Sequence, residues 1–139
     1  MIGVLMKGMD QGLLNKMIAL TQTGKKCCLF SGSPLLSEVP ALFPVFQPLR
    51  AYHFEGTLVS TDMSTTEMLS KLVLPKKKYF YVRSLEWTML QNCDYNYLKS
   101  IYQNDSIELI AANKEIFEVL KKLFKEPVGI SEDLDLEEI

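Results

Sequence analysis

Short apolar runs alternate with amphipathic stretches along most of the chain. An apolar run at Met1–Met6 ends in a glycine-containing loop, and Gly12–Thr23 carries apolar residues at helical spacing before Gly24, a residue type common just after helices. Further strands are predicted at 25–31, 56–61, 78–82, 107–111 and 128–130, and further helices at 64–72, 95–102 and 116–124. This alternation predicts an α/β fold with a mostly parallel sheet of five to six strands.

Two segments carry local signals of their own. Four prolines between Pro34 and Pro48 exclude one long helix, so short helical turns and irregular chain are predicted over 35–54. The run Ser64-Thr65-Thr66-Glu67 matches a capping box, which predicts that a helix begins at Ser64.

The composition is that of one globular domain. The chain has 139 residues, 47% of them apolar and 23% charged, which excludes disordered and low-complexity classes. We expect a single domain at 1–131 followed by an acidic tail at 132–139, which holds five of the 17 acidic residues. The net charge of −2 gives no argument for binding a membrane or nucleic acid, although the remaining 12 acidic residues stand against 15 basic ones, so the domain without its tail is slightly basic.

The cysteines indicate a reducing compartment, and the hydropathy indicates neither a signal peptide nor a membrane span. Three cysteines, Cys27, Cys28 and Cys93, show neither a disulfide framework nor a zinc spacing, so no metal is predicted. No apolar run has the length of a signal peptide core or a membrane span. We therefore expect a soluble cytoplasmic protein.

A ligand is expected at the carboxyl ends of the strands, where open parallel sheets bind their ligands. The first loop, GMDQG at 8–12, places Gly8 and Gly12 around Asp10. It matches neither GxGxxG nor a Walker A loop, so it is a weak nucleotide signal, and no cofactor is predicted. Its glycines either approach a ligand or simply turn the chain, and Asp10 is either a general base or a helix N-cap.

Other polar residues follow the later strands. Ser31 follows the second strand, Asp62 the third, and the segment Arg83–Trp87 the fourth. Asp62 either accepts hydrogen bonds from ligand hydroxyls or caps the next helix. Ser84, Glu86 and Trp87 suit a sugar, with the indole stacked on the ring, although Trp87 could equally pack in the core beside a surface glutamate.

Two basic features are expected to have structural roles. His53 is the only histidine and precedes the third strand, away from the predicted carboxyl edge, so a hydrolase triad is not expected. The run Lys76-Lys77-Lys78 begins the fourth strand and is interpreted as a solvated edge rather than a nucleic-acid groove.

The order of these elements resembles that of GT-B glycosyltransferases. The segment IGVLMKGMDQGLLNKMIALTQTGKKCCLF is similar to the opening of such enzymes, and IELIAANKEIFEVLKKLFKEPVGISEDLDLEEI to the end of their N-terminal domain. Asp135 stands where the family has the Asp of an Asn-Gly-Val-Asp segment, although the Asn-Gly is absent. The segments HFEGTLVSTDMSTTEMLSKL and KKKYFYVRSLEW resemble glycosyltransferase-like proteins of large tailed phages, which would place the chain in the host cytoplasm.

This resemblance implies a Rossmann-like three-layer domain that binds a sugar acceptor, with Asp10 as the base on the acceptor hydroxyl. GT-B enzymes bind the nucleotide-sugar mainly through a second Rossmann domain, which this sequence does not include. We therefore expect no activity from the chain alone and a separate donor-domain chain as partner. The alternatives are a non-catalytic protein that self-associates and a small nucleotide-binding enzyme.

Overall fold

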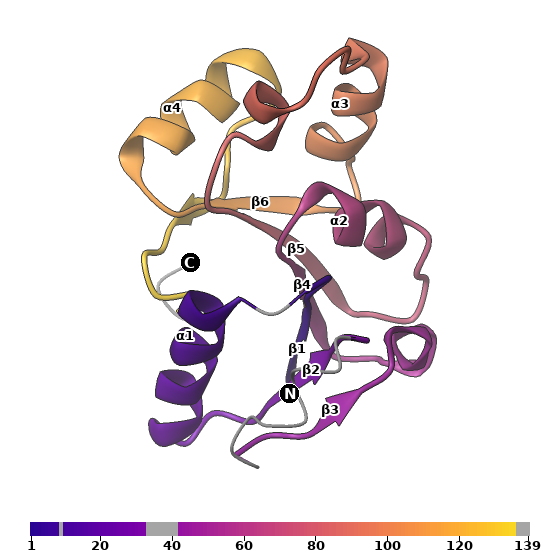
Figure 1. The fold of residues 1–139 in the computed structure, drawn as a ribbon, viewed down its shortest axis with the longest axis vertical. Helices are drawn as coiled ribbons and strands as arrows, with labels where there is room; N and C mark the ends of the chain where they lie inside the picture. Colours follow the sequence, from indigo (N-terminus) through magenta and orange to yellow (C-terminus); the bar gives the residue numbers. More distant parts are fainter. Residues whose placement is uncertain (9, 33–41, 136–139) are drawn as a thin grey trace.

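The fold is a Rossmann-like α/β domain, shown in Figure 1 as a computed structural model that describes residues 1–8, 10–32 and 42–135. Its seven strands form one sheet in which every neighbouring pair is parallel, in the order β3-β2-β1-β4-β5-β6-β7. The strands are β1 (Ile2–Leu5), β2 (Cys27–Phe30), β3 (Val45–Phe46), β4 (Thr57–Ser60), β5 (Lys77–Val82), β6 (Glu108–Ala111) and β7 (Gly129–Ile130). The predicted fold class is confirmed.

Helices cover the two faces of the sheet unequally (Figure 1). Helix α1 (Gln11–Gln22) packs on one face, where Leu13 and Met17 join the buried sheet residues Val4 and Val59. The other face carries the 3-10 turn η2 (Pro48–His53) and the helices α2 (Met63–Ser70), α3 (Tyr95–Tyr102) and α4 (Lys114–Leu123). None of the helices in the described residues is long and apolar enough to cross a membrane.

Each central strand contributes to two separate cores, one on each face of the sheet. In β4, Leu58 belongs to the core under α2, α3 and α4, whereas its neighbour Val59 belongs to the core under α1. Successive side chains of a strand point to opposite faces. A strand buried on both faces therefore needs apolar residues at every position, and this explains the unbroken run CCLF in β2.

The segment after β7 packs onto the face that carries α1. Leu134 is fully buried there although its φ of 58° lies in the left-handed region. The Tyr81 hydroxyl lies 2.8 Å from the carbonyl oxygen of Ser131, and Lys25 forms an ion pair with Asp135 at 2.6 Å. The first residues of the predicted acidic tail, as far as Asp135, are therefore packed against the domain.

Two local predictions differ from the structure. The proline-rich stretch, predicted to be irregular, contains the edge strand β3, which pairs with β2. Pro44 directly precedes β3 and still supplies its carbonyl, which accepts a hydrogen bond from the Leu29 N–H at 2.9 Å. Proline is tolerated at the start of an edge strand because its carbonyl can still accept a hydrogen bond from the neighbouring strand without an N–H of its own. Helix α2 begins at Met63, one residue before the predicted Ser64, and Asp62 is its N-cap.

The helix C-terminus predicted at Gly24 is confirmed. Gly24 has a φ of +90°, which a residue with a Cβ rarely adopts, and it follows Thr23, the C-cap of α1.

We predict that Leu134→Ala lowers the free energy of unfolding by about 2–4 kcal/mol, because it removes a fully buried side chain from the core under α1. Urea denaturation measures the change. Leu49→Ala, at a side chain that is 75% exposed, is the matched control and should change stability by less than about 0.5 kcal/mol. Equal stability of the two variants would show that the segment after β7 is not part of the cooperative fold.

Candidate functional site

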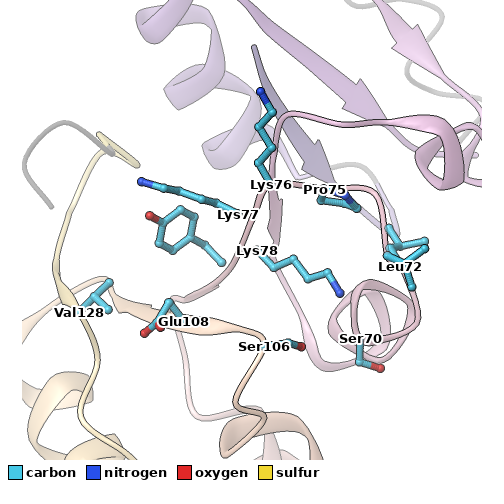
Figure 2. Close-up of a pocket in the computed structure, with 11 residues that line it drawn as sticks. Ser70, Leu72, Pro75, Lys76, Lys77, Lys78, Ser106, Glu108 and Val128 are labelled. Carbon is cyan, nitrogen blue, oxygen red and sulfur yellow. The ribbon is translucent and has the colours of Figure 1, made fainter.

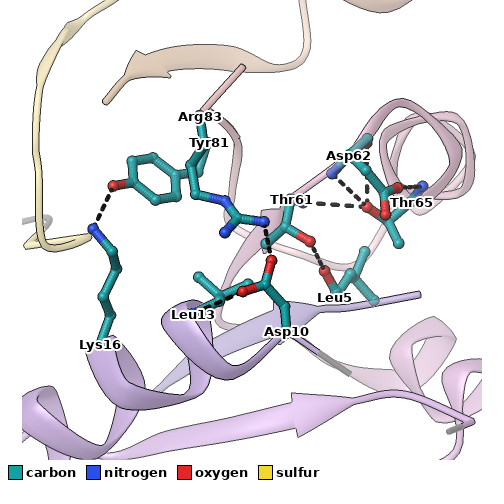
Figure 3. A network of polar contacts seen from close by, with 9 residues as sticks. All are labelled: Leu5, Asp10, Leu13, Lys16, Thr61, Asp62, Thr65, Tyr81 and Arg83. Atoms are coloured by element: carbon teal, nitrogen blue, oxygen red, sulfur yellow. Dashed lines mark hydrogen bonds and ion pairs between the residues drawn. The ribbon is translucent and has the colours of Figure 1, made fainter. Parts of the chain in front are cut away.

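The candidate site lies where the chain changes direction across the sheet. From β1 the chain proceeds to β2 and β3 on one side, and it then returns to β4 on the other side of β1. The loops that leave the carboxyl ends of β1 and β4 therefore diverge, and this divergence is where parallel α/β sheets bind ligands. Figure 3 shows Asp10, Thr61, Asp62 and Arg83 gathered at this edge.

Asp10 is held in two directions. It is the N-cap of α1, and its Oδ1 accepts a hydrogen bond from the Leu13 N–H at 3.0 Å. Its Oδ2 lies 2.5 Å from a terminal guanidinium nitrogen of Arg83, the first residue after β5. The Arg83 hydrogen bond, opposed by partial burial and aided by the backbone, lowers the pKa of Asp10. A carboxylate with a lowered pKa is a weaker proton acceptor.

Thr61 and Asp62 directly follow β4 and form hydrogen bonds with the end of β1 and the start of α2. The Thr61 hydroxyl donates a hydrogen bond to the carbonyl oxygen of Leu5 at 2.8 Å, which ties the carboxyl ends of β1 and β4 together. Asp62 is the N-cap of α2, and its Oδ1 accepts from the Thr65 N–H at 2.7 Å. The helix-capping alternative for Asp62 is therefore present in the structure.

Glu86 lies beside these residues and differs from Asp10 in its electrostatics. It belongs to η3 (Glu86–Met89), and its Oε2 accepts from the Met63 N–H, at the start of α2, at 3.2 Å. Burial is the main cause of a raised pKa for Glu86, and the nearby Asp62 charge adds to it. Arg83 and Lys7 act in the opposite direction, which places both cations near the same carboxylate.

Protein carboxylates occupy the amino ends of α1 and α2, the two helices that follow β1 and β4 at the switch point. Asp10 accepts from α1, while Asp62 and Glu86 accept from α2. A helix N-terminus binds phosphate through free N–H groups and a positive dipole end. Here those groups face carboxylates, which also repel an anion. The arrangement disfavours a nucleotide phosphate and suits a neutral ligand with hydroxyl groups.

The glycines of the first loop do not have the close contacts of a phosphate cradle. Gly8 is exposed, and a Cβ built on it would meet no atom within 4 Å. A Cβ on Gly12 would lie 3.5 Å from Asp10 Oδ1, which is an ordinary contact. A Cβ fits at both positions, so the described backbone does not require glycine there.

The remaining predicted residues are placed differently. Ser84 is exposed at the carboxyl end of β5, and Ser31 is buried after β2, where its N–H donates to the Phe46 carbonyl. Trp87 packs edge-on against Tyr102 and Phe124, with ring centroids 5.0 and 5.5 Å away. Of the two roles weighed for Trp87, the structure thus contains packing in the core. His53 is exposed at the end of η2.

Two buried donors near Glu86 have no hydrogen-bond partner in the described part of the chain. They are the Nε of Arg83 and the hydroxyl of Tyr102. Burial and the neighbouring Glu86 charge both raise the pKa of Tyr102, so its phenol stays protonated. Arg83 thus binds Asp10 through one nitrogen and keeps its Nε buried, with no hydrogen-bond partner in the described part of the chain.

Metal chemistry has no visible basis in the residues that the structure describes, where no group of three or more His, Cys, Asp or Glu side chains could hold an ion. Cys27 and Cys28 are buried in β2, and burial raises the pKa of the Cys28 thiol to about 11. A thiol with such a pKa is a poor nucleophile at neutral pH.

Comparison with known proteins identifies no relative. No protein-family model, no curated protein and no solved structure matches the chain significantly. The resemblance to GT-B glycosyltransferases and to phage proteins therefore stays a prediction that rests on sequence patterns.

Sequence reasoning did not anticipate the pairing of Asp10 with Arg83. The two residues are 73 positions apart, and only the sheet order brings the end of β5 next to the loop after β1. The available signal was an arginine directly after a buried strand, in a loop already expected at the carboxyl edge.

We predict that Asp10→Asn lowers stability at neutral pH by up to about 1 kcal/mol, because the pair with Arg83 is partly exposed. Asparagine keeps the helix-capping oxygen, so the variant isolates the charge. The folded pKa of Asp10 is lowered, so its contribution is complete above the unfolded value of about 3.9 and is lost as pH falls through the folded pKa. Urea unfolding from acidic to neutral pH should show the two proteins converging in acid. A constant difference at every pH would contradict the ion-pair account.

Proposed function

We propose that this domain binds a saccharide at the carboxyl edge, as the acceptor-binding half of a GT-B-type glycosyltransferase. The observation that carries the proposal is the ion pair of Asp10 with Arg83 at the switch point of the sheet, with the charges of Arg83 and Asp62 both acting on Glu86. Carboxylates accept hydrogen bonds from sugar hydroxyls, and a guanidinium donates to them. These are the groups that a neutral polyhydroxyl ligand needs.

The same cluster argues against a nucleotide as the main ligand of this edge. The carboxylates that cap α1 and α2 use the N–H groups that a phosphate would need, and their charge repels an anion. In the proposed reaction, the nucleotide-sugar is therefore held by a separate donor domain, in agreement with the resemblance to GT-B enzymes. Sugar transfer then requires a partner that brings this domain.

Asp10 and Glu86 differ in their suitability as the base of such a transfer. Asp10 is in the position that the resemblance assigns to the base, but the Arg83 hydrogen bond lowers its pKa. Glu86 has a raised pKa because it is half-buried, and it is the better proton acceptor of the two. We therefore assign Asp10 to positioning Arg83 and the start of α1, and Glu86 to the acceptor hydroxyl.

We predict that saturation-transfer NMR detects binding of simple saccharides such as glucose, galactose, N-acetylglucosamine or maltose. UDP and UDP-glucose should bind more weakly than the best saccharide. Glu86→Gln should weaken that binding by about 10-fold or more, since it removes one charge-assisted hydrogen bond. The variant keeps an amide oxygen that can still accept from the Met63 N–H.

Glu118→Gln is the matched control, because Glu118 is exposed in the middle of α4. It should bind saccharides as the unmodified chain does. Tighter binding of UDP than of any saccharide, or equal affinities of the Glu86 and Glu118 variants, would remove the proposed acceptor site.

A further inference from the structure

The opposite edge of the sheet gathers lysines. Lys76, Lys77 and Lys78 stand at the amino end of β5, and Lys71 follows the C-terminus of α2 on the same side. Within the described residues none of these four lysines forms an ion pair. We call the segment Lys71–Lys78 the basic edge.

Three lysine side chains of the basic edge, those of Lys76, Lys77 and Lys78, point apart. They border an open hollow of about 790 Å³, which Ser70, Ser106 and Glu108 also line. Figure 2 shows the ammonium groups of Lys76, Lys77 and Lys78 directed to three different sides. A compact anion such as a single phosphate needs donors that converge on one point. Diverging cations instead match a partner that is itself extended and negatively charged.

Apolar side chains lie exposed among these lysines. Val73 is 89% exposed and Leu74 is 45% exposed, and both precede Lys76 in the same loop. Met1, 61% exposed, lies close by, because its carbonyl oxygen is near Gly56 and the Gly56 carbonyl accepts from the Lys76 N–H at 3.0 Å. Apolar side chains between cations are typical of surfaces that dip into a lipid interface, whereas a nucleic-acid backbone offers nothing for them to bury against.

The charge of this edge stays positive when its carboxylates are included. Glu55 precedes β4, and Asp105 and Glu108 lie at the start of β6. Against these three stand the four lysines of the basic edge and Lys26 before β2. The carboxyl edge, in contrast, carries Asp10, Asp62 and Glu86 against Lys7 and Arg83. The net charge of −2 for the whole chain hides this separation.

We propose that the basic edge docks reversibly on a membrane surface that carries anionic lipid headgroups, with Val73 and Leu74 entering the headgroup layer. Lys71, Lys76, Lys77 and Lys78 supply the attraction to the headgroups, which acts within about 10 Å at moderate salt. Partial burial lowers the pKa of Lys78, and an anionic surface would favour its charged form. The candidate sugar site lies at the opposite edge and stays open to solution.

The test is co-sedimentation of the full chain with phosphatidylcholine vesicles, prepared with and without phosphatidylglycerol. Only the anionic vesicles should bind. The triple variant Lys76→Glu, Lys77→Glu, Lys78→Glu should lower the partition coefficient by about 100-fold or more, since each lysine near the surface contributes about five-fold. The double variant Val73→Ser, Leu74→Ser should lower it by about 10-fold and remove the part of the binding that resists salt.

The triple variant Lys99→Glu, Lys114→Glu, Lys122→Glu is the matched control, because it makes the same change in net charge at exposed positions of α3 and α4. It should change the partition coefficient by less than about three-fold. Circular dichroism checks that every variant is folded. If the triple glutamate variant has lost structure, the variant Lys76→Gln, Lys77→Gln, Lys78→Gln replaces it.

Four outcomes would overturn the proposal. They are equal losses in the two triple variants, equal binding to both kinds of vesicle, sedimentation of the chain without vesicles, and binding of a single-stranded oligonucleotide in place of anionic vesicles. Sedimentation without vesicles would identify a second copy of this chain as the partner of the basic edge, and oligonucleotide binding would identify a nucleic acid. None of these results depends on whether a saccharide binds at the carboxyl edge.

Discussion

Parallel pairing of all strands in the described sheet places their carboxyl ends at one edge and their amino ends at the other. Both the candidate site and the basic edge follow from this constraint. Asp10, Asp62 and Glu86 come from loops that leave the carboxyl ends of different strands, and they lie at one edge because those ends share it. The same geometry collects Lys76, Lys77 and Lys78 at the other edge with the N-terminus of the chain.

At the carboxyl edge, the pKa values of two carboxylates differ in direction, and one of the two forms an ion pair with an arginine. Arg83 binds Asp10 directly and lowers its pKa, whereas Glu86 is left half-buried with a raised pKa. Pairs of carboxylates whose environments move their pKa values apart are typical of sites that combine a positioning anion with a proton acceptor. In this chain the positioning anion also caps α1, so the orientation of Arg83 and the start of the helix are fixed by the same side chain.

Much of the fold is readable from the sequence because local and tertiary preferences agree. Unbroken apolar runs such as CCLF indicated strands buried on both faces, and Gly24 marked the end of α1. The strand β3 was missed because its two residues are defined by pairing with β2 and by no periodicity of their own. The start of α2 was misplaced because Asp62 and Ser64 are both residue types that cap helices, and the capping box in the structure joins Asp62 to Thr65.

The candidate site was predictable in its location but not in its contacts. The rule that ligands bind at carboxyl ends selected Asp10, Asp62 and Glu86 without any structure. It could not show that Trp87 packs against Tyr102 and Phe124, because stacking on a sugar and packing in a core need the same residue type.

The most direct measurement of the central claim is a titration of the ¹⁵N-labelled chain with the best-binding saccharide, followed by two-dimensional NMR. If the carboxyl edge is the ligand site, the amides of Lys7, Asp62, Arg83 and Glu86 shift, and those of Lys76–Lys78 do not. Shifts confined to the amino edge, or no shifts with any saccharide, would contradict the account.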